Sequence, residues 1–152
     1  MTIQLQFVAE AGVGATAIRW FTHSDFSHVD TVMPDGRLLG ARSDTATPGV
    51  AIRSPDYAMF TTRKRVTVPT SDAAAAIFYA FLHAQLGKPY DMTAIYAFAV
   101  NRNWREVDSW FCSELVASAL ETAGIVKIVS QANRITPNDA FLLAASVSSS
   151  VY

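Results

Sequence analysis

The chain has 152 residues, of which 51% are hydrophobic and 16% charged, with 12 basic and 13 acidic side chains and a formal net charge of −1. This length fits one domain and the apolar fraction suffices for a core, which excludes a wholly disordered chain. The near-neutral charge argues against a general nucleic-acid binder, and the single cysteine excludes an internal disulfide framework and a cysteine-rich zinc site.

Targeting signals are not evident in the sequence. No window approaches the run of about 18–20 apolar residues of a membrane-spanning helix. Residues 1–15 carry no Lys or Arg, unlike the start of a signal peptide. We therefore expect no stable membrane insertion and a cytoplasmic location by default, with delivery outside the cell by another route left open. We expect one domain over residues 1–152, with a weakly ordered serine-rich tail over 146–152.

Strand patterns dominate the first half of the chain. Apolar and polar residues alternate from Ile3 to Val8, which is typical of a half-buried strand. Pro34-Asp35-Gly36 separates two strand-like runs and predicts a β-hairpin. The expected elements are strands over 3–8, 28–33, 37–39, 50–53 and 63–68, a short helix over 15–21 after a break at 12–14, and a loop over 43–49. Residues 57–62 are left unassigned, and the basic run at 63–65 is expected to be a solvated edge.

The second half of the chain has helical patterns. Between Ile77 and Ala84 apolar residues recur on one helical face, Ser71-Asp72 can cap the start, and Gly87 and Pro89 end the helix. Further helices are expected over 93–100, 112–123 and 137–145, the last capped by Thr136. A hairpin and strands followed by helices predict the α+β class, with an antiparallel sheet packed against helices.

Cys112 falls in the first turn of its helix if Asp108 or Ser109 is the cap. There the backbone N–H groups have no intrahelical partner and the helix dipole favours negative charge, so both would stabilise the nucleophilic thiolate. The same amides could bind the oxyanion that forms when a carbonyl is attacked. Glu114 lies on another side of the helix and is interpreted as a first-turn charge. The alternative is that Cys112 is a small buried core residue, as lone cysteines commonly are.

Three histidines are candidates for the base that would activate Cys112. His28 opens a strand, and a strand holds a side chain in a defined direction. His83 lies on the polar side of its helix and is expected at the surface. His23 lies in a loop where exposure is expected, although it stays an alternative to His28. A metal site would need Cys112, His23 and His28 from separate elements, so we expect no metal and no other cofactor.

Two distant stretches together resemble a known superfamily. Phe26-Ser27-His28-Val29 opens the hairpin, and Gly87-Lys88-Pro89-Tyr90-Asp91 is followed by Phe111-Cys112-Ser113-Glu114-Leu115-Val116. Over roughly residues 18–142 this order resembles the circularly permuted branch of the papain-like NlpC-type cysteine peptidases, which is related to the lecithin retinol acyltransferase family. The resemblance implies a papain-like fold in which Cys112 attacks a carbonyl, His28 activates it and Tyr90 lines the site.

The chain departs from that family at the residue that orients the histidine. The family usually has a polar residue in the next strand, where this chain has Gly40, whereas Asp30 occupies a position that is often glycine in relatives. If the hairpin loop has three residues, 34–36, Asp30 lies opposite Gly40 and can bend back to the ring of His28. A two-residue loop would instead put Ser43 opposite His28 and make Ser43 the orienting residue. We favour Asp30.

These residues favour a cysteine hydrolase. Cys112 would attack an amide or ester, His28 would protonate the leaving group, and water would release the acyl-enzyme. The resemblance implies a peptidoglycan-type peptide or a lipid or acyl substrate, and for the latter Trp104, Trp110 and Phe111 could supply an apolar lip. Two alternatives stay open. One is a papain-like module that binds a ligand without turnover, which the missing orienting residue supports, and the other is an unrelated structural protein.

Overall fold

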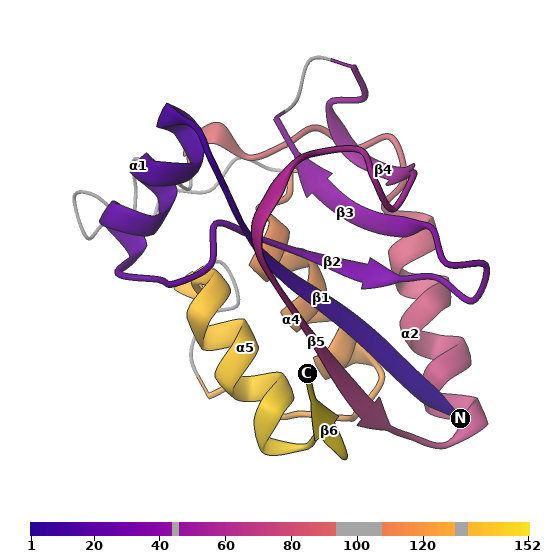
Figure 1. Ribbon diagram of the computed structural model, residues 1–152. Coiled ribbons are helices and arrows are strands. Elements are labelled where there is room, and N and C mark those ends of the chain that lie inside the picture. The colour runs from indigo at the N-terminus through magenta and orange to yellow at the C-terminus, as the bar shows by residue number, and fades with distance from the viewer. Residues whose placement is uncertain (44–45, 94–107, 130–133) are drawn as a thin grey trace.

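An antiparallel sheet forms the centre of the computed structural model, which describes residues 1–43, 46–93, 108–129 and 134–152 (Figure 1). The six strands, in the order β4-β3-β2-β1-β5-β6, are β1 (Thr2–Glu10), β2 (His28–Val32), β3 (Leu38–Arg42), β4 (Gly49–Arg53), β5 (Phe60–Pro69) and β6 (Ser150–Val151). The helices are α1 (Val13–Thr22), α2 (Asp72–Ala84), α4 (Cys112–Thr122) and α5 (Pro137–Ser146). Helices α2, α4 and α5 lie on the same face of the sheet, and α1 stands to one side. The predicted α+β class is confirmed.

The alternation in β1 divides its side chains between the two faces of the sheet. Ile3, Leu5 and Phe7 are fully buried in the main core, where they meet apolar side chains of α2, α4 and α5. Burying one such side chain stabilises the fold by roughly 1.5–3 kcal/mol. On the other face, Gln6 of β1 is paired with Asp30 of β2, and Val8 is paired with His28. Directly opposed residues share a face. The segment that joins β4 to β5 crosses in front of that face (Figure 1).

The hairpin between β2 and β3 has the three-residue loop on which the register prediction depends. Met33 N–H donates to the carbonyl of Arg37 at 2.8 Å, which closes the loop over residues 34–36. Gly36 has φ +84°, a conformation that favours glycine. Thr31 is paired with Leu39, so the same register places Asp30 opposite Gly40.

The caps of two helices agree with the sequence prediction and that of α4 does not. Ser71 caps α2, and Thr136 forms a capping box with Asp139 at the start of α5. The residue at the N-cap of α4 is Phe111, which has no side-chain capping bond, so Asp108 and Ser109 as caps were wrong. Since a phenylalanine side chain cannot accept a hydrogen bond, it leaves the first amides of α4 without a side-chain partner from the cap.

The tail differs from its predicted state. Ser150–Val151 form β6 on the edge of β5, and Tyr152 N–H donates to the carbonyl of Arg65 at 3.0 Å. The expectation of a weakly ordered tail was therefore wrong, because these backbone groups complete the hydrogen bonds of an edge strand. The helix predicted over 93–100 lies, beyond residue 93, outside the described residues. Among the helices that are described, none is long and apolar enough to cross a membrane.

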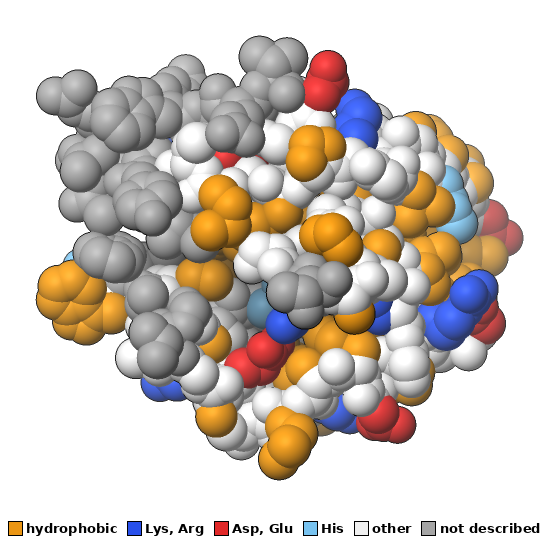
Figure 2. Space-filling model, turned by 90° about the horizontal axis from the view of Figure 1, so that it is seen from above, with side chains coloured by type: hydrophobic (Ala, Val, Ile, Leu, Met, Phe, Trp, Pro, Cys, Tyr) orange, Lys and Arg blue, Asp and Glu red, His pale blue; other side chains and the backbone are white. Residues whose placement is uncertain are grey.

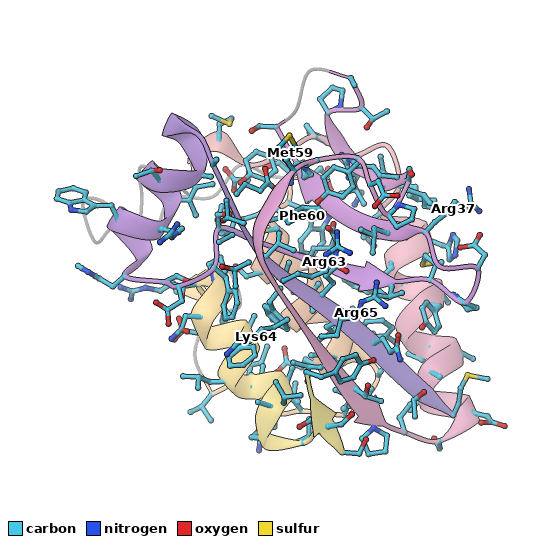
Figure 3. All side chains as sticks on the ribbon, in the orientation of Figure 1. Arg37, Met59, Phe60, Arg63, Lys64 and Arg65 are labelled. Atoms are coloured by element: carbon cyan, nitrogen blue, oxygen red, sulfur yellow. The ribbon has the colours of Figure 1, made fainter. Side chains whose placement is uncertain are left out.

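The basic run lies within β5 (Figure 3), and β5 pairs with the short edge strand β6 only at Val66 and Thr67. Arg63 and Lys64 are exposed, and the Arg63 guanidinium carbon lies 4.8 Å from the ring centre of Phe60. Arg65 donates to Gln6 Oε1 at 3.2 Å. β5 begins at Phe60, earlier than predicted. Its polar side chains lie in solvent or against neighbouring strands.

Candidate active site

His28 lies between Cys112 and Asp30. His28 is the first residue of β2 and Cys112 the first residue of α4, and the two side chains make a hydrogen bond. On the other side of the imidazole, His28 Nε2 lies 2.8 Å from Asp30 Oδ1. A strand and a helix from opposite halves of the chain thus bring a thiol, an imidazole and a carboxylate together in a row.

Asp30 reaches His28 because residue 40 has no side chain. A Cβ built on Gly40 would lie closer than 3.0 Å to Asp30 Oδ1 and 3.2 Å from its Cγ. Real Cβ atoms essentially never approach another heavy atom so closely. The Asp30 carboxylate therefore fills the space that a side chain at position 40 would need, as the three-residue hairpin loop predicted.

The charged groups of this row shift one another's pKa. Burial lowers the pKa of His28, but the charges of Asp30 and Cys112 and hydrogen bonds to both outweigh burial and raise the pKa to about 9. Burial raises the pKa of Asp30, yet the charge and hydrogen bond of His28 and the Tyr57 hydroxyl hold it below its usual value. At neutral pH the arrangement therefore favours an imidazolium beside an ionised carboxylate.

Three further residues, which the sequence analysis missed, form a chain of hydrogen bonds that starts at Asp30. The Tyr57 hydroxyl donates to Asp30 Oδ2 at 2.7 Å, and Arg42 Nη1 donates to the Tyr57 oxygen at 3.0 Å. Arg42 also binds both carboxylate oxygens of Glu10, at 2.5 and 3.0 Å. A signal for Arg42 was present, because the register that puts Asp30 opposite Gly40 also puts Arg42 opposite His28. Tyr57 comes from an irregular segment whose sequence carries no comparable signal.

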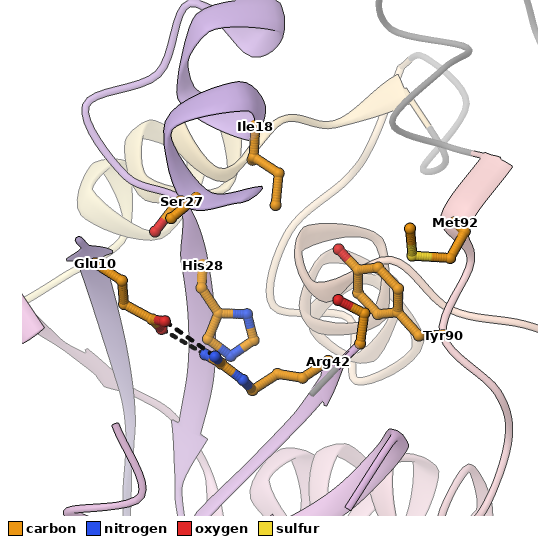
Figure 4. A pocket seen from close by; sticks show the side chains of 9 residues that line it. Glu10, Ile18, Ser27, His28, Arg42, Tyr90 and Met92 are labelled. Carbon is orange, nitrogen blue, oxygen red and sulfur yellow. Dashed lines mark hydrogen bonds and ion pairs between the residues drawn. The ribbon is translucent and has the colours of Figure 1, made fainter. Parts of the chain in front are cut away.

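A cavity of about 170 Å³ opens beside His28 (Figure 4). Its lining includes His28, Tyr90, Ser43 and the ion pair of Arg42 with Glu10. Seen from above, apolar side chains surround the place where basic, acidic and imidazole groups lie together (Figure 2). A second cavity of about 590 Å³ shares Ser43 and Tyr90 with the first, so the two lie side by side at the site.

Cys112 itself is fully buried. Its side chain is 0% exposed and does not line either cavity. Tyr90 and His28, which do line the first cavity, both interact electrostatically with Cys112. Burial, with the nearby charge of Cys112, raises the pKa of Tyr90 well above its usual value, so its hydroxyl stays protonated. A substrate in the cavity would therefore meet His28 and Tyr90 before it reaches the sulfur.

The remaining predicted residues lie in different places. Ser43 lines both cavities, but the three-residue loop keeps it from the position opposite His28, so it does not take the orienting role. Trp110 is only 8% exposed, and its indole N–H donates to Gln85 Oε1 at 3.1 Å. Trp110 is thus a core residue, and the prediction that it forms an apolar lip was wrong.

Several other predictions concern the surface and metal binding. His23 and His83 are both exposed, as expected. Phe111 is buried in the core at 1% exposure, and Trp104 lies outside the described residues. Glu114 belongs to the first turn of α4, as interpreted, and is buried. In the described ranges no three His, Cys, Asp or Glu side chains are grouped so that they could hold a metal ion.

Comparisons with known proteins relate the chain to a fold. No protein-family model matches it, and no curated protein sequence matches it. The structure is similar to the crystal structure of metalloprotein yiiX from Escherichia coli O157:H7, with a TM-score of 0.56 and 17% sequence identity. The match covers 100% of this chain and 94% of that chain. At that identity the similarity shows a shared fold alone.

Proposed function

We propose that this protein is a cysteine hydrolase of the papain-like, circularly permuted type, which transfers an acyl group from an amide or ester to Cys112 and then to water. The observation that carries the proposal is the position of His28, which bonds Cys112 on one side and Asp30 on the other. Lone core cysteines have no need of such a partner. The chain order of histidine strand before cysteine helix further supports the permuted type.

The proposed reaction begins with attack by the thiolate. Because His28 Nε2 is engaged by Asp30, Nδ1 is the ring nitrogen left for the sulfur and for the leaving group. Cys112 Sγ would attack the carbonyl carbon, and the imidazolium of His28 would protonate the leaving amine or alcohol. Neutral His28 would then take a proton from water as water attacks the thioester, which releases the acid and restores Cys112.

The start of α4 supplies the groups that the tetrahedral intermediate needs. Cys112 is the first helical residue, and Phe111 before it provides no capping side chain. Backbone N–H groups at such a helix start can donate to the oxyanion, and the helix dipole adds to that stabilisation. The Tyr90 hydroxyl, which stays protonated, would be a further donor on the cavity side.

The metal named for yiiX is a property of that protein. Here both oxygens of Asp30 and Nε2 of His28 already have hydrogen-bond partners, Tyr57 among them. In the part of the chain that is described, these residues do not form a set of three that could hold a metal ion. The described residues of the site therefore offer no such set, and no step of the proposed reaction uses a metal.

Two cavities at the site suit a substrate with groups on both sides of the scissile bond. The smaller one contains the Arg42–Glu10 ion pair, and the larger one is lined by Pro48, Pro89 and glycine backbone besides Tyr90. A peptidoglycan-type peptide and a lipid or acyl ester are the two substrate classes that we propose to test.

A cytoplasmic site of action is part of the proposal, and delivery outside the cell is its alternative.

The full burial of Cys112 favours the second candidate function, a papain-like module that binds its ligand without turnover. The two functions differ in one measurable event, the formation of an acyl-enzyme. Purified protein should be incubated with muropeptides, with short-chain thioesters and with phospholipid vesicles, using Cys112→Ala as the control. Release of a product that Cys112→Ala does not release would support the hydrolase. Binding of a ligand without release, equal in both proteins, would support the binding module.

A further inference from the structure

The orientation of Asp30 depends on Tyr57, which lies outside the row formed by Cys112, His28 and Asp30. Asp30 is 0% exposed and uses its two carboxylate oxygens differently. Oδ1 faces His28 Nε2, whereas Oδ2 accepts from the Tyr57 hydroxyl at 2.7 Å. One hydrogen bond would leave the carboxylate free to turn about its last torsion, but partners at both oxygens fix its plane.

The direction of the Tyr57 hydrogen bond follows from chemistry. A guanidinium group can only donate hydrogen bonds, so Arg42 Nη1 at 3.0 Å must donate to the Tyr57 oxygen. The hydroxyl proton is then directed to Asp30, which accepts as a carboxylate. The Arg42 guanidinium carbon also lies 4.7 Å from the centre of the Tyr57 ring, so the ring and hydroxyl are held together.

Arg42 in turn is held by Glu10. Its two terminal nitrogens bind the two oxygens of Glu10, and both side chains are about 15% exposed or less. This forked geometry fixes the plane of the guanidinium group. Glu10 stands where the pairing of β1 with β5 shifts register. A chain of contacts therefore runs from Glu10 through Arg42 and Tyr57 to Asp30. Its residues come from β1, β3, the segment between β4 and β5, and β2.

We propose that Tyr57, held in place by the Arg42–Glu10 ion pair, is a positioning residue that fixes Asp30 on His28. The catalytic importance of Tyr57 rests on the proposed function. Its role in holding Asp30 on His28 does not. Among the described residues, the titratable and charged groups around the His28–Asp30 pair and Tyr57 are Glu10 on β1, Arg42 on β3, Arg53 on β4, Tyr90 on a connecting segment and Cys112 on α4.

The test uses Tyr57→Phe, which removes the hydroxyl and keeps the ring. Tyr79→Phe is the matched control, because the Tyr79 hydroxyl contacts the carbonyl of Val32 at 3.5 Å, away from the site. The pKa of His28 is read from its ring signals by NMR, in a background that lacks the exposed His23 and His83. The rate of acetylation of Cys112 by p-nitrophenyl acetate is measured on the same proteins.

In Tyr57→Phe the carboxylate can turn away, so burial prevails and the pKa of His28 should fall from about 9 by roughly one unit. The limiting acetylation rate should fall roughly tenfold, with little change in the p-nitrophenyl acetate concentration that gives half the limiting rate. Tyr79→Phe should match the unchanged protein in both measurements. An equal pKa of His28 in Tyr57→Phe and Tyr79→Phe overturns the proposal.

The outcome separates this proposal from the proposed function. If the unchanged protein is not acetylated on Cys112 but the pKa of His28 falls in Tyr57→Phe, the hydrolase is refuted and the positioning role stands. If Tyr57→Phe does not fold, Arg42→Lys carries the same test. A lysine keeps the charge but cannot bind Glu10 and Tyr57 as a fork, so the pKa of His28 should fall in the same direction. An unchanged pKa in that variant overturns the proposal.

Discussion

Gly40→Ala adds a single methyl group and tests how Asp30 reaches His28. The new Cβ would overlap Asp30 Oδ1, so the carboxylate must retreat by roughly 1 Å to reach an ordinary separation. The hydrogen bond of 2.8 Å to His28 Nε2 would then exceed normal hydrogen-bond length. The backbone at position 40 is not in the left-handed region, so alanine adds no backbone strain.

The effect of Gly40→Ala should appear in both the pKa of His28 and the stability of the protein. With Asp30 displaced, burial should lower the pKa of His28 from about 9 by at least one unit, and each unit corresponds to about 1.4 kcal/mol. Loss of this buried hydrogen bond should reduce the free energy of unfolding by about 1–3 kcal/mol. NMR titration of the His28 ring and urea unfolding measure the two quantities.

A double-mutant cycle shows whether the methyl group acts through Asp30. In an Asp30→Ala background the space beside residue 40 is open, so Gly40→Ala should change the pKa of His28 little further. The reasoning is refuted if Gly40→Ala leaves that pKa at about 9, or if its effect is the same with and without Asp30.

Further predictions concern single residues. Asp30→Ala, if folded, should slow alkylation of Cys112 by iodoacetamide well over tenfold; unchanged kinetics would refute the role of Asp30. The raised pKa of His28 should contribute about 3 kcal/mol of stability, present in full below pH 6.5 and lost as pH rises through about 9. Urea unfolding from pH 6 to 10 should show that loss in the unchanged protein and not in His28→Gln, and equal pH profiles would contradict it. Ser43→Ala should weaken substrate binding yet leave the pKa of His28 at about 9, and a fall in that pKa would mean that Ser43 orients the ring. Thr136→Ala should reduce the free energy of unfolding by about 1 kcal/mol through loss of the α5 cap, and no change in the urea midpoint would argue against it.

The parts of the site that were predictable from sequence are those set by regular pairing. A hairpin loop of known length determines which residues face each other, so Pro34-Asp35-Gly36 reduced the possible registers to two. The three-residue loop is the one that places Asp30 opposite Gly40. The helix over 112–123 could be predicted from the sequence and does begin at Cys112, although the expected caps, Asp108 and Ser109, were wrong. Contacts that follow from strand register and helix spacing need no knowledge of the rest of the fold.

Other features depend on contacts between distant segments. Tyr57 lies in an irregular connection whose path over the sheet no local pattern determines. The tail became a strand because the edge of β5 had unpaired backbone groups, which a composition argument about serine does not consider. Trp110 was a candidate for a lip because it precedes the cysteine helix, whereas its indole N–H donates to Gln85 inside the core.

The most direct test of the central claim is to trap the acyl-enzyme. Protein is incubated with p-nitrophenyl acetate near neutral pH, and the acetylated residue is identified by intact mass and peptide mapping. In the unchanged protein Cys112 should acquire one acetyl group. In His28→Asn this acetylation should be at least tenfold slower, and the Cys112→Ala protein should acquire no acetyl group. Absence of acetyl on Cys112 in the folded protein, or an equal rate in His28→Asn, would contradict the claim that His28 activates Cys112.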